Sequence, residues 1–210
     1  MVVADANVLS RLSVSSRRGG KDFRVRTFLL GLVLGAVIFP LIVILYLVMG
    51  FAPAAATAPA MPFERFIAGT ALEKRISREA PHRDLSTFGT SDIVSGAELY
   101  KKNCAVCHGT YGQPTPPIAR AMYPEAPQLL TPEGMVTDDP VGVTYWKVSN
   151  GIRLSGMPSF GDILTEPQRW QLSAFLARVN KLPDEAQEAL KANDSAPGVG
   201  AQPILPKTNK

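Results

Sequence analysis

Cys104-Ala105-Val106-Cys107-His108 is the stretch of this sequence that decides the fold. It holds the only two cysteines of the chain and one of its two histidines, in the order C-x-x-C-H that is typical of c-type haem attachment. Two thiols at this spacing can reach the two vinyl groups along one edge of a haem, and the adjacent imidazole is then delivered to the iron. The motif therefore predicts one covalent haem c, with His108 as the proximal iron ligand.

A C-x-x-C pair also occurs in zinc sites and in redox dithiols. A structural zinc site needs about four ligands, and the sequence has no second Cys or Cys/His pair to complete one. A redox dithiol is expected beside a βαβ pattern, which this sequence lacks. Both alternatives are therefore less favoured than haem.

The formal charge of +4 is concentrated at the N-terminus. Residues 1–26 carry six basic and two acidic side chains, and the remaining sixteen of each sign cancel. This segment has no apolar period and predicts a disordered, basic cytoplasmic tail. Because no basic patch with interleaved aromatic residues follows it, nucleic-acid binding is not expected.

Residues 27–51, TFLLGLVLGAVIFPLIVILYLVMGF, contain no charged side chain. About 20 apolar residues cross a bilayer as a helix, so the stretch predicts a single transmembrane anchor. Ala56-Thr57-Ala58 resembles a signal cleavage site, but the apolar run is longer than a typical signal core, and a retained anchor is favoured. The basic residues before it predict that the haem domain faces the periplasmic side of a bacterial inner membrane.

Residues 52–90 are predicted to be a linker with one short helix. The Ala/Pro-rich APAAATAPAMP of residues 52–62 is typical of a tether. Apolar residues then recur at helical spacing over residues 63–79, and Pro81 follows. This amphipathic helix either lies on the next domain or docks to a membrane partner. His82, in a polar turn, is assigned no role.

The haem domain is predicted to span residues 91–182. Ser91 or Asp92 should cap a helix that leads to the haem motif, and a Gly- and Pro-rich loop over residues 109–127 follows the motif. A second helix is expected over residues 141–150, and a capping box at residues 165–168 opens a last helix that reaches residue 179. Residues 183–210 are predicted to be a flexible tail, with one possible short helix at residues 184–191.

Met157 is the candidate for the distal iron ligand. It lies in the Gly156-Met157-Pro158 loop, where proline limits the backbone on one side and glycine permits a tight turn on the other. Met122 and Met135 are alternatives, and a loop methionine also serves in apolar packing. Thioether ligation opposite histidine raises the iron potential and favours electron exchange over oxygen binding.

Together these motifs resemble the class I mono-haem cytochromes c. The resemblance covers residues 91–182 and rests on C-A-V-C-H-G, Gly96-x-x-x-Tyr100, N-G-I-R-L-S-G-M-P-S-F and Trp170…Phe175. It implies an all-α cytochrome c fold wrapped around one covalent haem, preceded here by a single transmembrane helix. In such a fold the first and last helices cross near Gly96, Tyr100 and Phe175.

The resemblance also implies the roles of the haem-binding residues. Cys104 and Cys107 would form the thioether bonds, and His108 and Met157 would be the axial ligands. A proline carbonyl usually orients the proximal histidine through its free ring N–H; Pro117 is the preferred candidate and Pro127 the alternative. Trp170 either neighbours a haem propionate or is an ordinary core residue.

The predicted function is one-electron transfer by a membrane-tethered haem protein in a respiratory chain. No general acid–base pair, nucleophile or oxyanion arrangement is evident, so the domain itself is not expected to be an enzyme. The expected partners are the lipid bilayer and a quinol-oxidising complex, terminal oxidase or dehydrogenase. The alternative is a haem c subunit of a periplasmic dehydrogenase or of a quinol- or oxygen-linked complex. A haem-based gas sensor would require an open sixth iron position.

Overall fold

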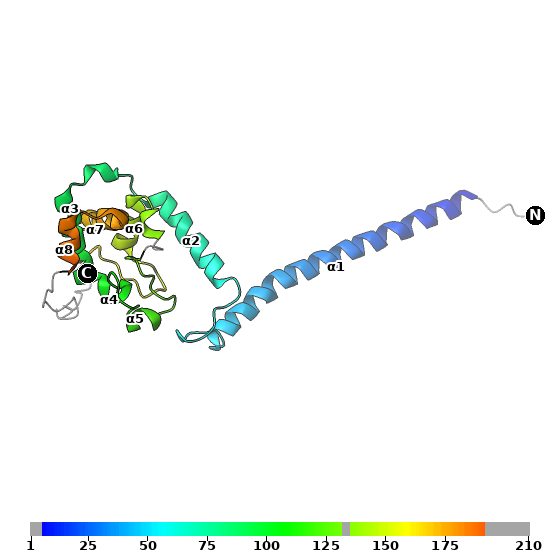
Figure 1. Ribbon diagram of the computed structural model, residues 1–210. Helices are drawn as coiled ribbons and strands as arrows, with labels where there is room; N and C mark the ends of the chain where they lie inside the picture. Colours follow the sequence, from blue (N-terminus) through cyan, green and yellow to red (C-terminus); the bar gives the residue numbers. More distant parts are fainter. Residues whose placement is uncertain (1–5, 132–134, 192–210) are drawn as a thin grey trace, which may run out of the picture. The chain divides into compact units, whose positions relative to one another are not determined.

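The computed structural model describes residues 6–131 and 135–191. In these two ranges all regular structure is helical, which confirms the expected all-α class (Figure 1). The α-helices are α1 (Ala6–Val48), α2 (Glu64–Glu79), α3 (Thr90–Asn103), α4 (Ala105–His108), α5 (Pro117–Arg120), α6 (Val141–Asn150), α7 (Glu166–Ala177) and α8 (Asp184–Lys191), and the short 3₁₀ helices are η1 (Leu85–Thr87), η2 (Met135–Thr137) and η3 (Val179–Lys181). The chain divides into two units, residues 1–54 and residues 55–210.

The first unit is dominated by the long helix α1. Its segment Phe23–Val48 has 26 residues and contains an 18-residue window with a mean hydropathy of 3.0, and among the described residues it is the one helix long and apolar enough to cross a membrane. An anchor and a signal peptide both have this length and composition. The helix begins at Ala6, so the predicted disordered tail is wrong from Ala6 onward. Extending an existing helix by a residue costs less than nucleating a new one, which favours this continuation.

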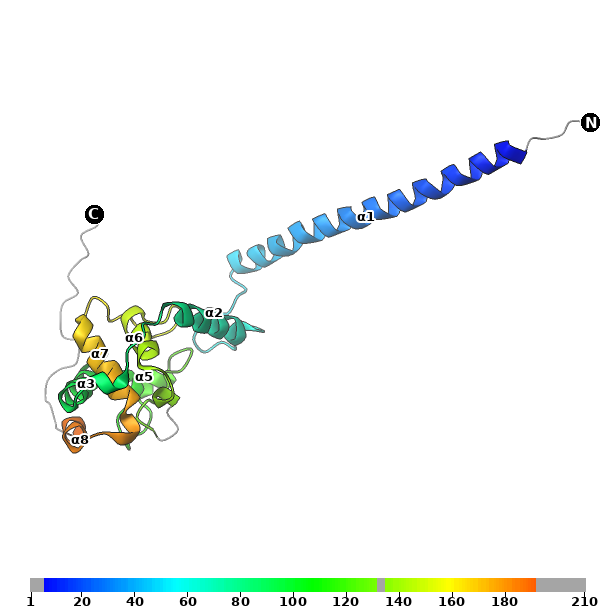
Figure 2. The same ribbon diagram turned by 90° about the horizontal axis from the view of Figure 1, so that it is seen from above.

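The second unit is built on the crossing of α3 and α7 (Figure 2). A Cβ atom on Gly96 would collide with the Gln171 carbonyl oxygen and lie 2.6 Å from Phe175 Cβ, so the two helices approach closely because residue 96 is glycine. Beside this contact the rings of Tyr100 and Phe175 have centroids 5.5 Å apart, and both side chains are fully buried. The crossing expected near these three residues is confirmed.

Proline, glycine and capping residues set the ends of the core helices. Helix α6 follows Pro140 and ends at Gly151, whose φ of 66° is left-handed, as predicted. Before α7, the Thr165 backbone N–H donates to Gln168 Oε1 at 2.9 Å, which forms one half of the predicted capping box. Helix α3 begins earlier than expected, because Asp92 caps it from inside the first turn by accepting from the Gly89 N–H at 3.1 Å.

Helix α8 extends the haem domain beyond the predicted boundary at residue 182. Ala186 is fully buried, and the Lys101 ammonium of α3 donates to the Ala189 carbonyl at 2.8 Å. The predicted short helix at residues 184–191 is therefore confirmed. It packs on the domain and is not part of a flexible tail. The remainder of the predicted tail, residues 192–210, lies outside the described residues.

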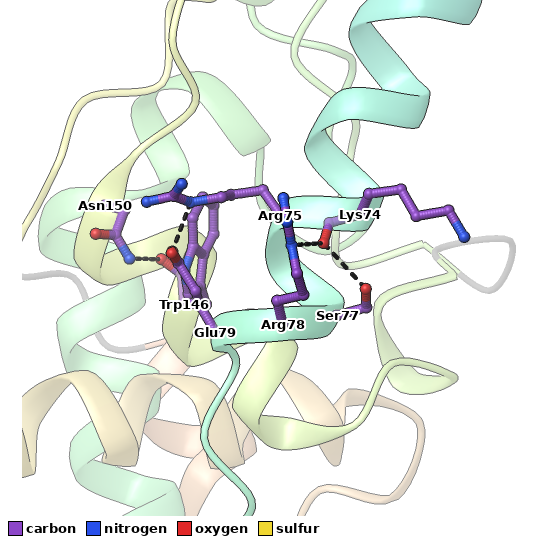
Figure 3. A network of polar contacts seen from close by, with 7 residues as sticks. All are labelled: Lys74, Arg75, Ser77, Arg78, Glu79, Trp146 and Asn150. Carbon is purple, nitrogen blue, oxygen red and sulfur yellow. Dashed lines mark hydrogen bonds and ion pairs between the residues drawn. The ribbon is translucent and has the colours of Figure 1, made fainter.

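Helix α2 packs against α6 and belongs to the second unit. Ile76 of α2 is buried, and the Trp146 indole N–H of α6 donates to the Glu79 carboxylate at 3.1 Å. The same carboxylate pairs with the Arg75 guanidinium at 2.7 Å, so Glu79 joins the two helices (Figure 3). The chain then passes over α6, where a Cβ on Gly142 would collide with the Pro81 carbonyl. The predicted amphipathic helix thus lies on the haem domain.

Candidate haem site

The two cysteines and the histidine of the haem motif lie on one helical turn. Cys104 directly follows α3, and its carbonyl accepts from the Cys107 N–H at 3.0 Å and from the His108 N–H at 2.8 Å. Both thiols are free and half-buried. The turn ends at Gly109, which has a φ of 72°. The three side chains that the sequence assigned to haem binding are thus presented from a single, locally hydrogen-bonded element.

Tyr100 ties this turn to the α3–α7 core. Its hydroxyl donates to the Gly109 carbonyl at 2.8 Å, and the His108 carbonyl is also within reach at 3.1 Å. Burial raises the pKa of Tyr100 well above its ordinary value, so the phenol remains protonated and acts as a donor. The end of the haem motif is therefore held by a side chain that packs on Phe175.

The proximal histidine contacts the carbonyl of Pro127, not that of Pro117. The distance from His108 Nδ1 to the Pro127 oxygen is 2.7 Å, and the Leu129 N–H returns a contact to the His108 carbonyl at 3.4 Å. A carbonyl oxygen can only accept, so Nδ1 carries the proton and Nε2 is left for a metal. This finding corrects the preference for Pro117, which instead opens helix α5.

The electrostatics of the turn fit a metal ligand better than a redox dithiol. Burial lowers the pKa of His108, and the Pro127 contact partly opposes this shift, so the imidazole is neutral, as a metal ligand must be. Burial, and to a lesser extent the nearby Cys107, raises the pKa of Cys104 to about 12. Reactive C-x-x-C dithiols have lowered thiol pKa values instead.

Met157 lies half-buried in a loop that is fixed to the end of α6. Its carbonyl accepts from the Ile152 N–H at 3.2 Å, and its own N–H lies 3.2 Å from Ser155 Oγ. Gly156 does not have a left-handed φ, contrary to the tight-turn argument. Its lack of a side chain instead makes room for Met122, because a Cβ there would lie 2.6 Å from the Met122 sulfur. Two thioethers, Met157 and the alternative Met122, thus lie on or against this loop.

The contacts around Trp170 of α7 were only partly anticipated from the sequence. Trp170 is buried and stacks on Tyr145 with ring centroids 4.0 Å apart, which fits the core role that the sequence left open for it. The Arg83 guanidinium lies over Phe88 at 4.5 Å and over Trp170 at 5.2 Å. The contact between Arg83 and Trp170 joins segments about 90 residues apart in sequence, and only the spacing of aromatic residues could have hinted at it.

The residues present fit a covalent haem. The turn offers two thiols and an imidazole with a free Nε2, and no described group of three or more His, Cys, Asp or Glu side chains is arranged to hold a metal ion without such a cofactor. Within the described chain, buried donors such as Gln128 Nε2 and Arg169 Nε also lack a protein partner. Buried polar atoms are seldom left unpaired, and haem carboxylates or ordered water would satisfy them.

An all-helical fold with a C-x-x-C-H turn beside crossed helices defines a c-type cytochrome. Residues 91–176 match the protein family described as cytochrome c oxidase, cbb3-type, subunit III, and this stretch is a cytochrome c domain of that family. No curated protein and no solved structure matches the chain. The domain and its Cys104/Cys107 pair imply covalent haem c and electron transfer.

Proposed function

We propose that this protein is a membrane-tethered one-electron carrier with a His108/Met157-ligated haem c. The observation that carries the proposal is the 2.7 Å contact between His108 Nδ1 and the Pro127 carbonyl inside a cytochrome c domain. This contact orients the imidazole beside two free thiols and leaves its Nε2 available. Haem c bound here would supply an iron that alternates between the ferrous and ferric states.

Each residue of the site has a distinct part in this proposal. Cys104 and Cys107 hold the haem through thioether bonds, and His108 is the proximal ligand. The Pro127 carbonyl fixes the ring of that histidine and raises its basicity, as hydrogen-bonded partners of metal ligands generally do. Met157 supplies the distal thioether, which excludes small ligands and raises the potential. The protein thus serves electron transfer rather than oxygen binding.

The tether follows from the apolar part of α1. Phe23–Val48 is long enough to span a bilayer, and the preceding segment is rich in Arg and Lys. The positive-inside rule then puts the N-terminus in the cytoplasm and the haem domain on the periplasmic side of the bacterial inner membrane. Tethering confines the carrier to the membrane plane and raises its effective concentration at membrane partners. Respiratory complexes, including terminal oxidases, are the partners that the family match supports.

A subunit fixed in a respiratory complex is the second candidate function, since the matched family is described as an oxidase subunit. Purification of the full chain in mild detergent separates the two proposals. A carrier is recovered alone, whereas a subunit is recovered with a stoichiometric partner. A periplasmic dehydrogenase or a quinol- or oxygen-linked complex would each be recognised by the activity of that partner.

The ligand assignment is tested with matched methionine variants of the haem-loaded full chain. Met157→Ala should lower the potential and let carbon monoxide bind the reduced iron, whereas Met122→Ala should do neither. A gas sensor would bind carbon monoxide before any substitution. If Met122→Ala rather than Met157→Ala opens the iron, Met122 is the distal ligand. If neither variant retains haem on a denaturing gel, covalent attachment of the haem is refuted.

A further inference from the structure

The first turn of α2 presents an apolar surface that the second unit does not cover. Phe63, Phe66 and Ile67 are 75%, 71% and 63% exposed, and Met61 beside them is 37% exposed. Large apolar side chains gathered at one place on a folded surface mark an interaction site more often than scattered ones do. Ile76, on another side of the helix, is buried, and α2 contacts α6 of the second unit.

The outward side of α2 continues from apolar to basic residues. On a helix, residues three and four apart share a face, so Ile67, Lys74 and Arg78 follow one another along the exposed side. Lys74 and Arg78 are both exposed, and neither forms a described salt bridge to a carboxylate. Glu79 is engaged instead with Arg75 and Trp146 (Figure 3). Binding of a helix to a bilayer surface combines burial of apolar side chains with attraction of Lys and Arg to anionic headgroups.

Chain length favours a lipid surface as the occupant. Fourteen residues separate the end of the apolar span at Val48 from Phe63. Fully extended, this tether reaches at most about 50 Å, so a retained anchor keeps α2 close to the bilayer at all times. A soluble partner would have no such permanent proximity. Charge complementarity between Lys74 and Arg78 and anionic headgroups points the same way.

We propose that the outer face of α2 is a membrane-docking surface: Phe63, Phe66 and Ile67 enter the headgroup–acyl boundary, while Lys74 and Arg78 contact anionic headgroups. The proposal rests on the proposed function, because it requires a retained anchor. Since the α2–α6 contact and the hydrogen bond from Trp146 to Glu79 hold α2 to the haem domain, docking of α2 also sets the orientation of that domain. The surface therefore orients the haem domain relative to the bilayer and does not act as a second membrane anchor.

The test uses the haem-loaded full chain in vesicles of phosphatidylcholine and phosphatidylglycerol. Cys104 and Cys107 are occupied by the haem, so Ile67→Cys provides a single thiol for an environment-sensitive fluorophore. The control is Glu188→Cys on α8, an exposed position on another element of the same unit (Figure 1). The label at position 67 should be quenched by nitroxide-labelled lipid and protected from aqueous iodide, and the label at position 188 should show the reverse.

Quenching of the label, flotation with vesicles and haem staining together separate the possible outcomes. Phe66→Ser, and separately Lys74→Gln with Arg78→Gln, should move the label at position 67 toward iodide quenching. If iodide quenches positions 67 and 188 equally, the surface does not dock to lipid. If position 67 is protected from both quenchers, a protein or second copy covers it, and the proposal is also overturned. Flotation of the protein with the vesicles and covalent haem staining report independently on the anchor and on the proposed function.

Discussion

Replacing Gly96 by alanine tests the helix crossing on which the haem turn is built. The added methyl would collide with the Gln171 carbonyl and lie 2.6 Å from Phe175 Cβ. Neither atom is the end of a flexible side chain, so the helices must separate. Overpacking of this kind costs about 1–3 kcal/mol, and these rigid neighbours favour the upper end. Alanine recovers about 1 kcal/mol through its helix propensity. The expected net loss is therefore about 2 kcal/mol.

Gly69→Ala is the matched control, because Gly69 also lies inside a helix but a Cβ added there would have nothing within 4 Å. The free energy of unfolding of this variant should be unchanged or should rise by up to about 1 kcal/mol. Guanidinium unfolding of the haem-loaded full chain in detergent, followed by circular dichroism of the haem band, measures both values. If the free energies of unfolding of the two variants agree to within about 0.5 kcal/mol, the difference expected from overpacking is absent and the close approach of α3 and α7 is refuted.

Three further predictions concern the haem turn and the α2 contact. Tyr100→Phe removes the hydroxyl donor to the buried Gly109 carbonyl and should cost about 1–2 kcal/mol in the same unfolding assay. Trp146→Phe should increase amide hydrogen exchange in residues 64–79 without changing exchange in α7, since it removes the hydrogen bond to Glu79. The Trp146 indole N–H and then the Arg75 guanidinium lower the pKa of Glu79 from 4.5, so its stabilising effect is complete above that pH and is lost as the pH falls through the lowered value. Exchange in residues 64–79 should therefore rise on acidification, and less so in Trp146→Phe.

Local signals in the sequence correctly predicted both ends of α6 and the start of α7. Pro140 and Gly151 bound α6 because one fixes the backbone before a helix and the other permits the left-handed residue after it. Thr165 and Gln168 marked the start of α7 for a similar reason. The C-x-x-C-H turn was recognisable because its chemistry requires those residue types at that spacing.

Contacts made by backbone atoms could not be predicted in the same way. Every residue has a carbonyl, so the choice between Pro117 and Pro127 depended on the path of an irregular loop rather than on residue type. Gly156 was expected to serve backbone conformation, but it serves the packing of Met122. The packing of α8 on α3 was not predicted from the sequence, because Ala186 gives only a weak apolar signal although it is fully buried. Tertiary packing, not local propensity, decided these features.

The contact between the Pro81 carbonyl and Gly142 restricts which residues homologous proteins can have at position 142. A methyl group at this position would displace the Pro81 carbonyl, so α2 can rest on the haem domain only where residue 142 lacks a side chain. A cytochrome c domain without a preceding chain segment at this place could carry a larger residue there. Glycine at this position should therefore be inherited together with the preceding helix, and its replacement in a relative should accompany the loss of the contact between α2 and α6.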